Sequence, residues 1–409
     1  MALMVAAVCT MLPQASGAGV VSFNPALELS QVYTSNALFT SEETAVSDSY
    51  TALALVLPLK REAPRNTAEF TYRPSYQAYD SLDSLSNLTH SLLFRLDSTP
   101  SESLSTNLST SYYRGQDQGI PNSDTGPDLV LTPRNTREQG RIDFGFSHRF
   151  SGKWNWGANV YYEALNYSSI EDIEQDPDVY IPEDRTTIGL VGRVGRAVSA
   201  RTNVGVAVRF NQFDLDISGT EQVQRLELTF LHKPSRRNQL DVRLGAFRGE
   251  FDRSVPVEPG QSDTRSGFSG NFLFERIFPA FNLQLFALHE PTSGYNFVGT
   301  STNTVAGLSL SWELSNQVSA GATARYSRAD STFQDDVTVE NIGLGGTLDY
   351  RPLRTLSFRF SATASDQTSG GQLEAAENAS IAVLQGSIDI VWSPLANKRI
   401  AAGFTGSGD

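Results

Sequence analysis

The chain of 409 residues has one cysteine, four histidines and no long apolar run. A single cysteine excludes a disulfide within the chain, so covalent cross-links cannot stabilise the fold. No run of 18 or more apolar residues occurs, which excludes a transmembrane helix but not a membrane protein built from strands. Hydrophobic residues make up 39% of the chain and the net charge is −13. Such a chain can bury little apolar core per residue.

Catalytic signatures are also missing. The four histidines, which are His90, His148, His232 and His289, lie in separate segments, and neither G-x-S-x-G nor H-E-x-x-H occurs. The glycines of GLVGRVG, residues 189–195, recur at every third residue inside a strand-like segment, so we interpret them as small residues of a crowded or bent wall and not as a phosphate loop. We predict that the protein is not an enzyme and needs no cofactor. A hydrolase whose residues meet across strands stays an alternative.

The most continuous apolar stretch lies at the N-terminus. Residues 2–12 have the length of a signal-peptide core, and the small residues of QASGAGV offer a cleavage site near Gly17 or Ala18. We therefore predict a signal peptide over residues 1–18 and an exported protein. Cleavage would remove Cys9, the only cysteine. A basic region before the apolar core is missing, which points to a start further upstream.

Alternation of apolar and polar residues runs along nearly the whole remaining chain. In GRIDFGFSHRF, residues 140–150, Ile142 and Phe144 point to one side while Arg141 and Asp143 point to the other. A period of two indicates a β-strand. Roughly eighteen or nineteen such segments occur, each about ten residues long, which is the length that crosses a bilayer in a tilted strand.

The polar face of these segments carries charges of both signs. On a soluble β-sandwich this face would meet water outside, whereas in a transmembrane barrel the apolar face meets lipid and the charged face lines a wet interior. Barrels of 16–18 strands leave an aqueous channel, so we predict a water-filled pore. The residues predicted to line it are Arg141, Asp143, Arg149, Glu163, Arg193, Arg209, Arg225, Glu227, Asp241, Arg243, Glu313, Arg325 and Arg359.

The connections between segments alternate between short and long. Short joins such as SGK and PSRRN carry basic residues, while long joins such as 116–138 and 168–185 carry most of the acidic ones. A barrel with tight periplasmic turns and long outer loops sorts its connections in this way, and a soluble sandwich has no reason to do so. We predict an all-β fold over residues 19–409, a transmembrane antiparallel up-and-down β-barrel of about 18 strands.

Aromatic residues gather near the segment ends, where a barrel carries girdles at the two membrane interfaces. The residues predicted to form these girdles are Tyr50, Tyr112, Tyr113, Tyr161, Tyr162, Tyr326, Tyr350, Trp154, Trp156, Trp312 and Trp392. The general preference of strands for aromatic residues is the alternative explanation.

The segment LELSQVYTSNALFT, residues 27–40, resembles the first-strand signature of the β-barrel porins often encoded beside bacterial exopolysaccharide systems. In that signature an alternating apolar strand runs into a Tyr-Thr-x-Asn turn. Here the turn is Tyr33, Thr34, Ser35 and Asn36, with Ser35 where an aspartate is common. The resemblance implies the bacterial outer membrane and a pore or export role. It transfers no catalytic or binding residue.

The predicted location in the bacterial outer membrane implies which partners the protein contacts. We expect outer-membrane lipid and lipopolysaccharide, the barrel-assembly machinery, and hydrophilic solutes or polysaccharide, and we expect no nucleic acid. Passive diffusion or export of solutes such as saccharides is the predicted function. A non-conducting structural or adhesive barrel is a further alternative.

The stretch IEDIEQDPDVYIPED is the one local candidate for a metal site. Its acidic residues occupy offsets 1, 3, 5, 7 and 12 of a calcium loop, but offset 6 is Pro177, where the turn needs a glycine, and no helices are predicted beside it. We predict a solvated acidic loop and no metal site, with calcium binding as the alternative. The acidic residues concerned are Asp172, Glu174, Asp176, Asp178 and Glu183.

The C-terminal segments raise a question of strand number. Residues 380–392 read as the eighteenth strand, and RIAAGFTGSGD, residues 399–409, reads as a nineteenth strand in the opposite direction. Bacterial single-chain barrels have an even number of strands, and an unpaired edge in lipid is costly. We therefore expect the chain to be incomplete at its C-terminus. A short tail on a complete barrel is the alternative.

Overall fold

The computed structural model describes residues 19–38, 42–116, 135–169, 184–216, 219–253, 264–293, 300–331, 338–370, 380–394 and 399–401. Strands dominate this part of the chain, because alternating segments with many β-branched and aromatic residues suit a pleated sheet with two different faces. The strands are β1 (Val20–Phe23), β2 (Ala26–Thr34), β3 (Asp48–Ala63), β4 (Asn66–Tyr79), β5 (Asn87–Ser101), β6 (Leu104–Gln116), β7 (Asn135–Arg149), β8 (Trp154–Ser169), β9 (Arg185–Ser199), β10 (Thr202–Leu215), β11 (Gly219–Ser235), β12 (Asn238–Arg253), β13 (Thr264–Ile277), β14 (Phe281–Ser293), β15 (Thr300–Glu313), β16 (Val318–Ser331), β17 (Thr338–Leu353), β18 (Leu356–Gly370), β19 (Ser380–Trp392) and β20 (Arg399–Ala401).

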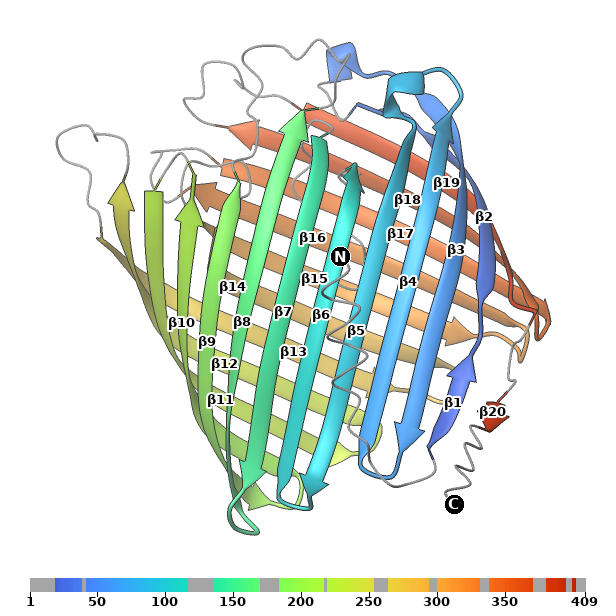
Figure 1. Cartoon of the computed structure of the whole chain (residues 1–409). Helices are drawn as coiled ribbons and strands as arrows, with labels where there is room; N and C mark the ends of the chain where they lie inside the picture. The colour runs from blue at the N-terminus through green and yellow to red at the C-terminus, as the bar shows by residue number, and fades with distance from the viewer. Residues whose placement is uncertain are drawn as a thin grey trace, which may run out of the picture.

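Eighteen of these strands, β2 to β19, close into one barrel (Figure 1). Each strand pairs antiparallel with its neighbours in the sequence, and the last strand, β19, pairs with the first, β2, from Gln385 opposite Thr34 to Trp392 opposite Leu27. The predicted up-and-down barrel is confirmed. Two single-turn 3-10 helices, η1 (Glu42–Thr44) and η2 (Asp83–Leu85), lie in the connections. No helix in the described part of the chain is long and apolar enough to cross a membrane.

The two shortest strands extend the pairing of the first and last strands. β1 pairs with β3 on one side and with β20 on the other, antiparallel in both cases. Because β19 runs antiparallel to β2 and β20 runs antiparallel to β1, β20 continues in the direction of β19. The expected nineteenth strand in the opposite direction is therefore wrong. The chain resumes pairing with the free edge of β1, and residues 402–409 lie outside the described part.

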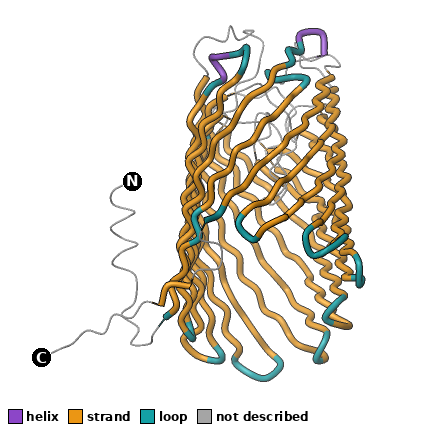
Figure 2. The backbone as a smooth tube through the Cα atoms, turned by 90° about the vertical axis from the view of Figure 1, so that its right-hand side faces the viewer, coloured by secondary structure: helices purple, strands orange, loops and turns teal. Residues whose placement is uncertain are grey.

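The two ends of the barrel differ in their connections (Figure 2). At one end, here the short-turn end, two to four residues join successive strands, as at residues 64–65 and 314–317. At the other, the long-loop end, the joins have three to eighteen residues. The predicted sorting by length is confirmed.

Large apolar side chains cover the outer face of the barrel. Leu226 is 57% exposed, Leu228 67% and Ile342 56%. A soluble protein rarely exposes large apolar side chains along the whole face of a strand. All four tryptophans lie on this face near the short-turn end, in positions that fit a girdle. The girdle prediction is wrong for Tyr50, Tyr113 and Tyr161, whose register places them on the inner face. Tyr161 also lies in the middle of β8 and not at a strand end.

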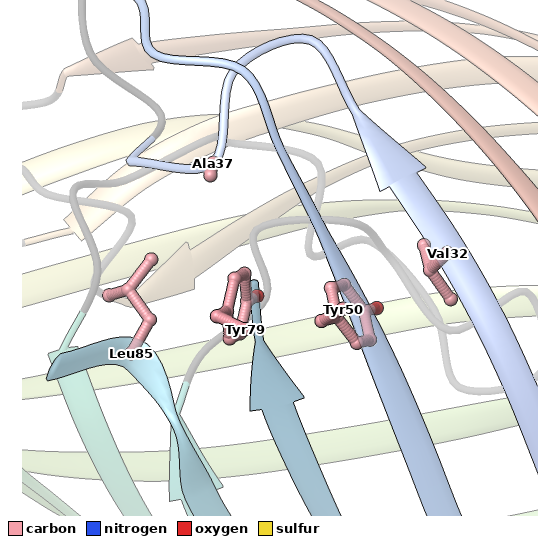
Figure 3. Packing of buried hydrophobic residues seen from close by; sticks show 5 residues of the cluster. All are labelled: Val32, Ala37, Tyr50, Tyr79 and Leu85. Carbon is pink, nitrogen blue, oxygen red and sulfur yellow. The ribbon is translucent and has the colours of Figure 1, made fainter. Parts of the chain in front are cut away.

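A small apolar cluster lies on the inner face at the long-loop end. It contains Val32, Ala37, Tyr50, Tyr79 and Leu85, from β2, the turn after it, β3, β4 and η2 (Figure 3). The rings of Tyr50 and Tyr79 pack with their centroids 4.7 Å apart, and Leu85 is fully buried. The turn of the first-strand signature ends in this cluster, which explains why it is buried and not a free loop.

Asp48 holds the turn at residues 80–86 against the cluster. Its Oδ2 accepts hydrogen bonds from the backbone N–H groups of Ser81 (3.3 Å) and Leu82 (2.9 Å), and its Oδ1 accepts one from the N–H of Ser49 (2.8 Å). The side chain is 6% exposed, so water competes little for these bonds.

We predict that Asp48→Ala loosens this turn. A hydrogen bond to a charged group contributes about 1.5–3 kcal/mol, so amide hydrogen exchange at Ser81 and Leu82 should accelerate by about tenfold or more. Exchange measured by mass spectrometry tests this. Asp83→Ala is the matched control, because the Asp83 side chain is exposed and has no hydrogen-bond partner in the described residues. Equal exchange in the two variants would contradict the role of Asp48.

Candidate functional site

The inner face of the barrel is identified by contacts that pass over intervening strands. Arg225 on β11 pairs with Glu290 on β14, and the Tyr161 hydroxyl on β8 donates to Asn211 Oδ1 on β10 at 3.0 Å. Side chains can bridge non-neighbouring strands only on the concave side of a curved sheet. Residues that share a face with these groups in the strand register therefore point inward.

All thirteen residues predicted to line a pore lie on this inner face. The register connects them directly, since Arg141 lies opposite Glu163 and Arg209 lies opposite Arg225. The others follow by alternation along β7, β9, β11, β12, β15, β16 and β18. That they line a conducting path stays a prediction.

One group of charges centres on Arg141. Its Nε and one terminal nitrogen donate to both carboxylate oxygens of Asp143 at 2.8 and 2.9 Å, and the other terminal nitrogen donates to Glu163 at 3.1 Å. Arg185 donates to the second oxygen of Glu163 at 3.0 Å, and the Arg141 guanidinium lies 4.2 Å from the centre of the Tyr161 ring. The Arg141 guanidinium lies between two carboxylates and fixes the positions of Asp143 and Glu163, because each of its three nitrogens donates to a different carboxylate oxygen.

Other predicted residues form separate ion pairs on the same face. Arg209 pairs with Glu227 at 2.8 Å, and Arg243 with Asp241 at 3.2 Å. Arg359 pairs with Asp349, across two adjacent strands, at 2.7 Å. Charges of both signs therefore cancel locally along most of the inner wall.

Three predicted residues make no ion pair with the described residues, and a fourth, Arg325, lies near an aromatic ring. The Arg325 guanidinium lies 5.8 Å from the centre of the Phe286 ring. Glu313 is exposed at the short-turn end of β15. Arg149 and Arg193 are exposed and make no ion pair or hydrogen bond with the described residues.

The interior differs between its two halves. Toward the long-loop end, inner-face residues such as Val223, Val305 and Asn341 are each 1% exposed. Toward the short-turn end lies a cavity of about 510 Å³, here the short-turn cavity. Its charged lining residues are Glu102, Arg149, Arg193, Arg209, Asp241 and Arg243.

Sequence reasoning missed several inner-face residues. Glu290 and Arg185 belong to the ion pairs, and alternation along FALHEP and RTTIGL would have found both. Apolar residues such as Phe213, Val223 and Phe247 form a buried cluster on the inner face. In the sequence, these residues could have been found because apolar residues occur on both faces of their strands toward the long-loop end.

The glycines of residues 189–195 take two roles. Gly189 and Gly195 face inward and Gly192 faces outward, because they are spaced by three in a strand. A Cβ on Gly189 would collide with the ring of Tyr161, whereas one on Gly192 would meet no atom within 4 Å. The prediction of a crowded wall holds at Gly189 and Gly195 but is wrong at Gly192, which faces open space.

The histidines do not form a catalytic group. All four lie on the outer face, and each contacts a polar group of a neighbouring strand: Tyr72 for His90, Trp156 for His148, Thr202 for His232 and Thr304 for His289. Among the described residues, no cluster of three or more His, Cys, Asp or Glu side chains could hold a metal ion. The acidic stretch from Asp172 to Glu183 lies outside the described residues.

An eighteen-stranded closed barrel with an apolar outer face and a charged inner face has the architecture of a bacterial outer-membrane β-barrel. Residues 13–225, more than half of the chain, match the model of the family "Putative beta-barrel porin 2". The chain belongs to this family, which confirms the resemblance seen in the first strand. It is a porin-like channel of the bacterial outer membrane.

Comparison with solved structures finds barrels of low sequence identity. OccK2 (OpdF) of Pseudomonas aeruginosa, in complex with glucuronate, is 12% identical with a TM-score of 0.47, over 91% of this chain and 99% of that one. OccAB3 of Acinetobacter baumannii is 11% identical with a TM-score of 0.46, over 91% and 99%. The FrpB iron transporter of Neisseria meningitidis (F3-3 variant) is 10% identical with a TM-score of 0.45, over 85% and 62%. Comparison with the curated proteins found no significant match.

We predict that Gly189→Ala destabilises the inner wall. The new methyl group must displace Tyr161, which weakens its hydrogen bond to Asn211 and its contact with Arg141. Overpacking of this kind costs about 1–3 kcal/mol in free energy of unfolding. Urea unfolding in detergent micelles measures it. The control Gly192→Ala should unfold as the unchanged protein does, and a similar loss in both variants would contradict the proposed contact.

Proposed function

We propose that the thirteen inner-face residues line a water-filled path for the passive diffusion or export of hydrophilic solutes, with saccharides as the favoured class. The observation that carries the proposal is the inner wall itself, on which paired arginines and carboxylates leave many hydrogen-bonding groups and little net charge. Facing charges of both signs favour hydrated, polar solutes over a single ion type. Export of a polysaccharide fits the resemblance of the first strand.

The proposal assigns the protein no catalytic role. The histidines sit on the outer face in separate contacts with neighbouring strands, so the residue type most used for proton transfer is away from the interior. Lipopolysaccharide is the expected contact of the outer rim, and the barrel-assembly machinery is the expected partner for insertion. Residues 1–18, outside the described part of the chain, are the proposed signal peptide.

A paired cysteine substitution tests the conducting path. Asn159 and Val160 are adjacent on β8; Asn159 lies opposite the inward-facing Gly145, and Val160 lies opposite the outward-facing Phe144. Because Cys9 is the only cysteine, a Cys9→Ser background leaves each new thiol as the sole target. In a planar bilayer, a negatively charged thiol reagent should reduce the single-channel conductance of Asn159→Cys and leave that of Val160→Cys unchanged.

Two outcomes would contradict the function. Absence of channel openings from the folded protein would favour a structural or adhesive barrel, while reagent block of Val160→Cys but not of Asn159→Cys would show that the inner and outer faces are wrongly assigned. Hydrolysis of lipid or lipopolysaccharide by the purified protein would instead support a hydrolase.

The orientation is tested on intact cells. Long loops with acidic residues are expected outside and short basic turns inside the periplasm. An epitope tag at Asp124, in a long join, should bind antibody on intact cells, whereas a tag at Arg236, in a short turn, should bind only after the outer membrane is opened. Surface labelling of the Arg236 tag alone would reverse the orientation.

A further inference from the structure

Two inner-face arginines that make no ion pair or hydrogen bond with the described residues lie in the same cavity. Arg149 and Arg193 both line the short-turn cavity, with the strand β8 between their strands. The other two arginines of the cavity are neutralised, since Arg209 pairs with Glu227 and Arg243 with Asp241. Glu102, in a turn at the edge, is the remaining carboxylate of the lining. The cavity therefore carries a local excess of positive charge on a wall that is otherwise balanced.

Inward-facing glycines make room for this cavity. A Cβ on Gly195 would lie 2.8 Å from Asn155 Oδ1 and 3.0 Å from Asn203 Oδ1, and a Cβ on Gly157 would lie 3.3 Å from Arg193 Nε. The side chains of Asn155, Asn203 and Arg193 thus lie next to the positions that a side chain at Gly195 or Gly157 would occupy. This arrangement leaves the space above them open and turns polar groups toward it.

The rest of the lining is rich in small polar groups. Hydroxyl and amide side chains surround the arginines, and they are both donors and acceptors. These lining residues are Thr99, Ser101, Ser103, Ser105, Ser147 and Thr229, together with Asn155 and Asn203. A volume of about 510 Å³ lies within the range of pockets that hold small molecules.

We propose that the short-turn cavity is a binding site for a sugar acid, a solute that combines a carboxylate with several hydroxyl groups. The forked guanidinium groups of Arg149 and Arg193 match a carboxylate, and the serine, threonine and asparagine side chains match the hydroxyl groups. The proposal rests on the proposed channel function and names a class of solute for it. Outside the cavity, arginines pair with carboxylates on the inner face, so such an anion would not be bound along the whole path.

Comparison of galacturonate with galactose and acetate distinguishes recognition of the carboxylate from recognition of the hydroxyl groups. Galactose has the hydroxyl groups without the carboxylate, and acetate has the carboxylate without the hydroxyl groups. In planar bilayers holding the full chain, galacturonate added at the short-turn side should block the ion current at lower concentration than either control. Equal block by acetate would reduce the site to a simple anion site and overturn the proposal, as would equal block by galactose.

Substitutions locate the site. Arg149→Gln with Arg193→Gln should weaken galacturonate binding by about tenfold or more, because charge-assisted hydrogen bonds are lost. Arg73→Gln with Arg95→Gln is the matched control: it removes the same charge from inner-face arginines that pair with Glu28 and Asp97 outside the cavity. Arg149→Lys with Arg193→Lys keeps the charge but loses the fork, and binding should fall between the two. Equal weakening in the Gln pair and its control would overturn the assignment.

Equilibrium dialysis of the detergent-solubilised protein with labelled galacturonate separates this proposal from the channel function. Binding that depends on Arg149 and Arg193 in a protein without conductance would refute the channel and leave the site intact. A conducting protein that binds no galacturonate in dialysis would refute the site and leave the channel intact.

Discussion

The whole structure depends on hydrogen bonding of the backbone where no water can reach it. Inside a bilayer each N–H and C=O of a strand must bond to another strand, so a spanning sheet has to close on itself. Here closure is made by β2 and β19, and Ser35 extends it: its N–H donates to the Leu384 carbonyl at 2.9 Å and its Oγ accepts from the Leu384 N–H at 2.8 Å. Pro25 has no N–H to offer, and pairing resumes beyond it between β1 and β20. The signature turn is thus part of the junction between first and last strand.

Closure also determines the two environments of the side chains. The alternation of a strand sends every second residue into lipid, where apolar groups are favoured, and the others into a confined polar space. Charges in that space are stabilised by partners close at hand, and the curvature of the wall provides partners that a flat sheet would not. The Arg225–Glu290 pair, between β11 and β14, exists because the concave wall brings these strands within side-chain reach.

The sequence is sufficient to predict which face Arg141 or Arg243 occupies, because strand parity is a local property. It is not sufficient to predict that Glu290 pairs with Arg225, since that contact depends on curvature across several strands. The girdle prediction failed for Tyr50 and Tyr161 for a related reason: the bounds and the register of a strand decide whether an aromatic residue lies near a membrane interface and on the outer face. The direction of β20 was wrong because a three-residue strand takes its direction from the edge it pairs with and not from its own residues.

The contrast between the two halves of the interior has an electrical consequence. In the proposed channel, the shielded inner wall at Val223 and Val305 would leave room for fewer mobile ions, so the electrical resistance would be concentrated toward the long-loop end. A voltage across the membrane would then fall mainly over that half. The short-turn cavity would stay close to the potential of the compartment it opens toward, and its occupancy by a charged solute would follow the concentration in that compartment with little dependence on voltage.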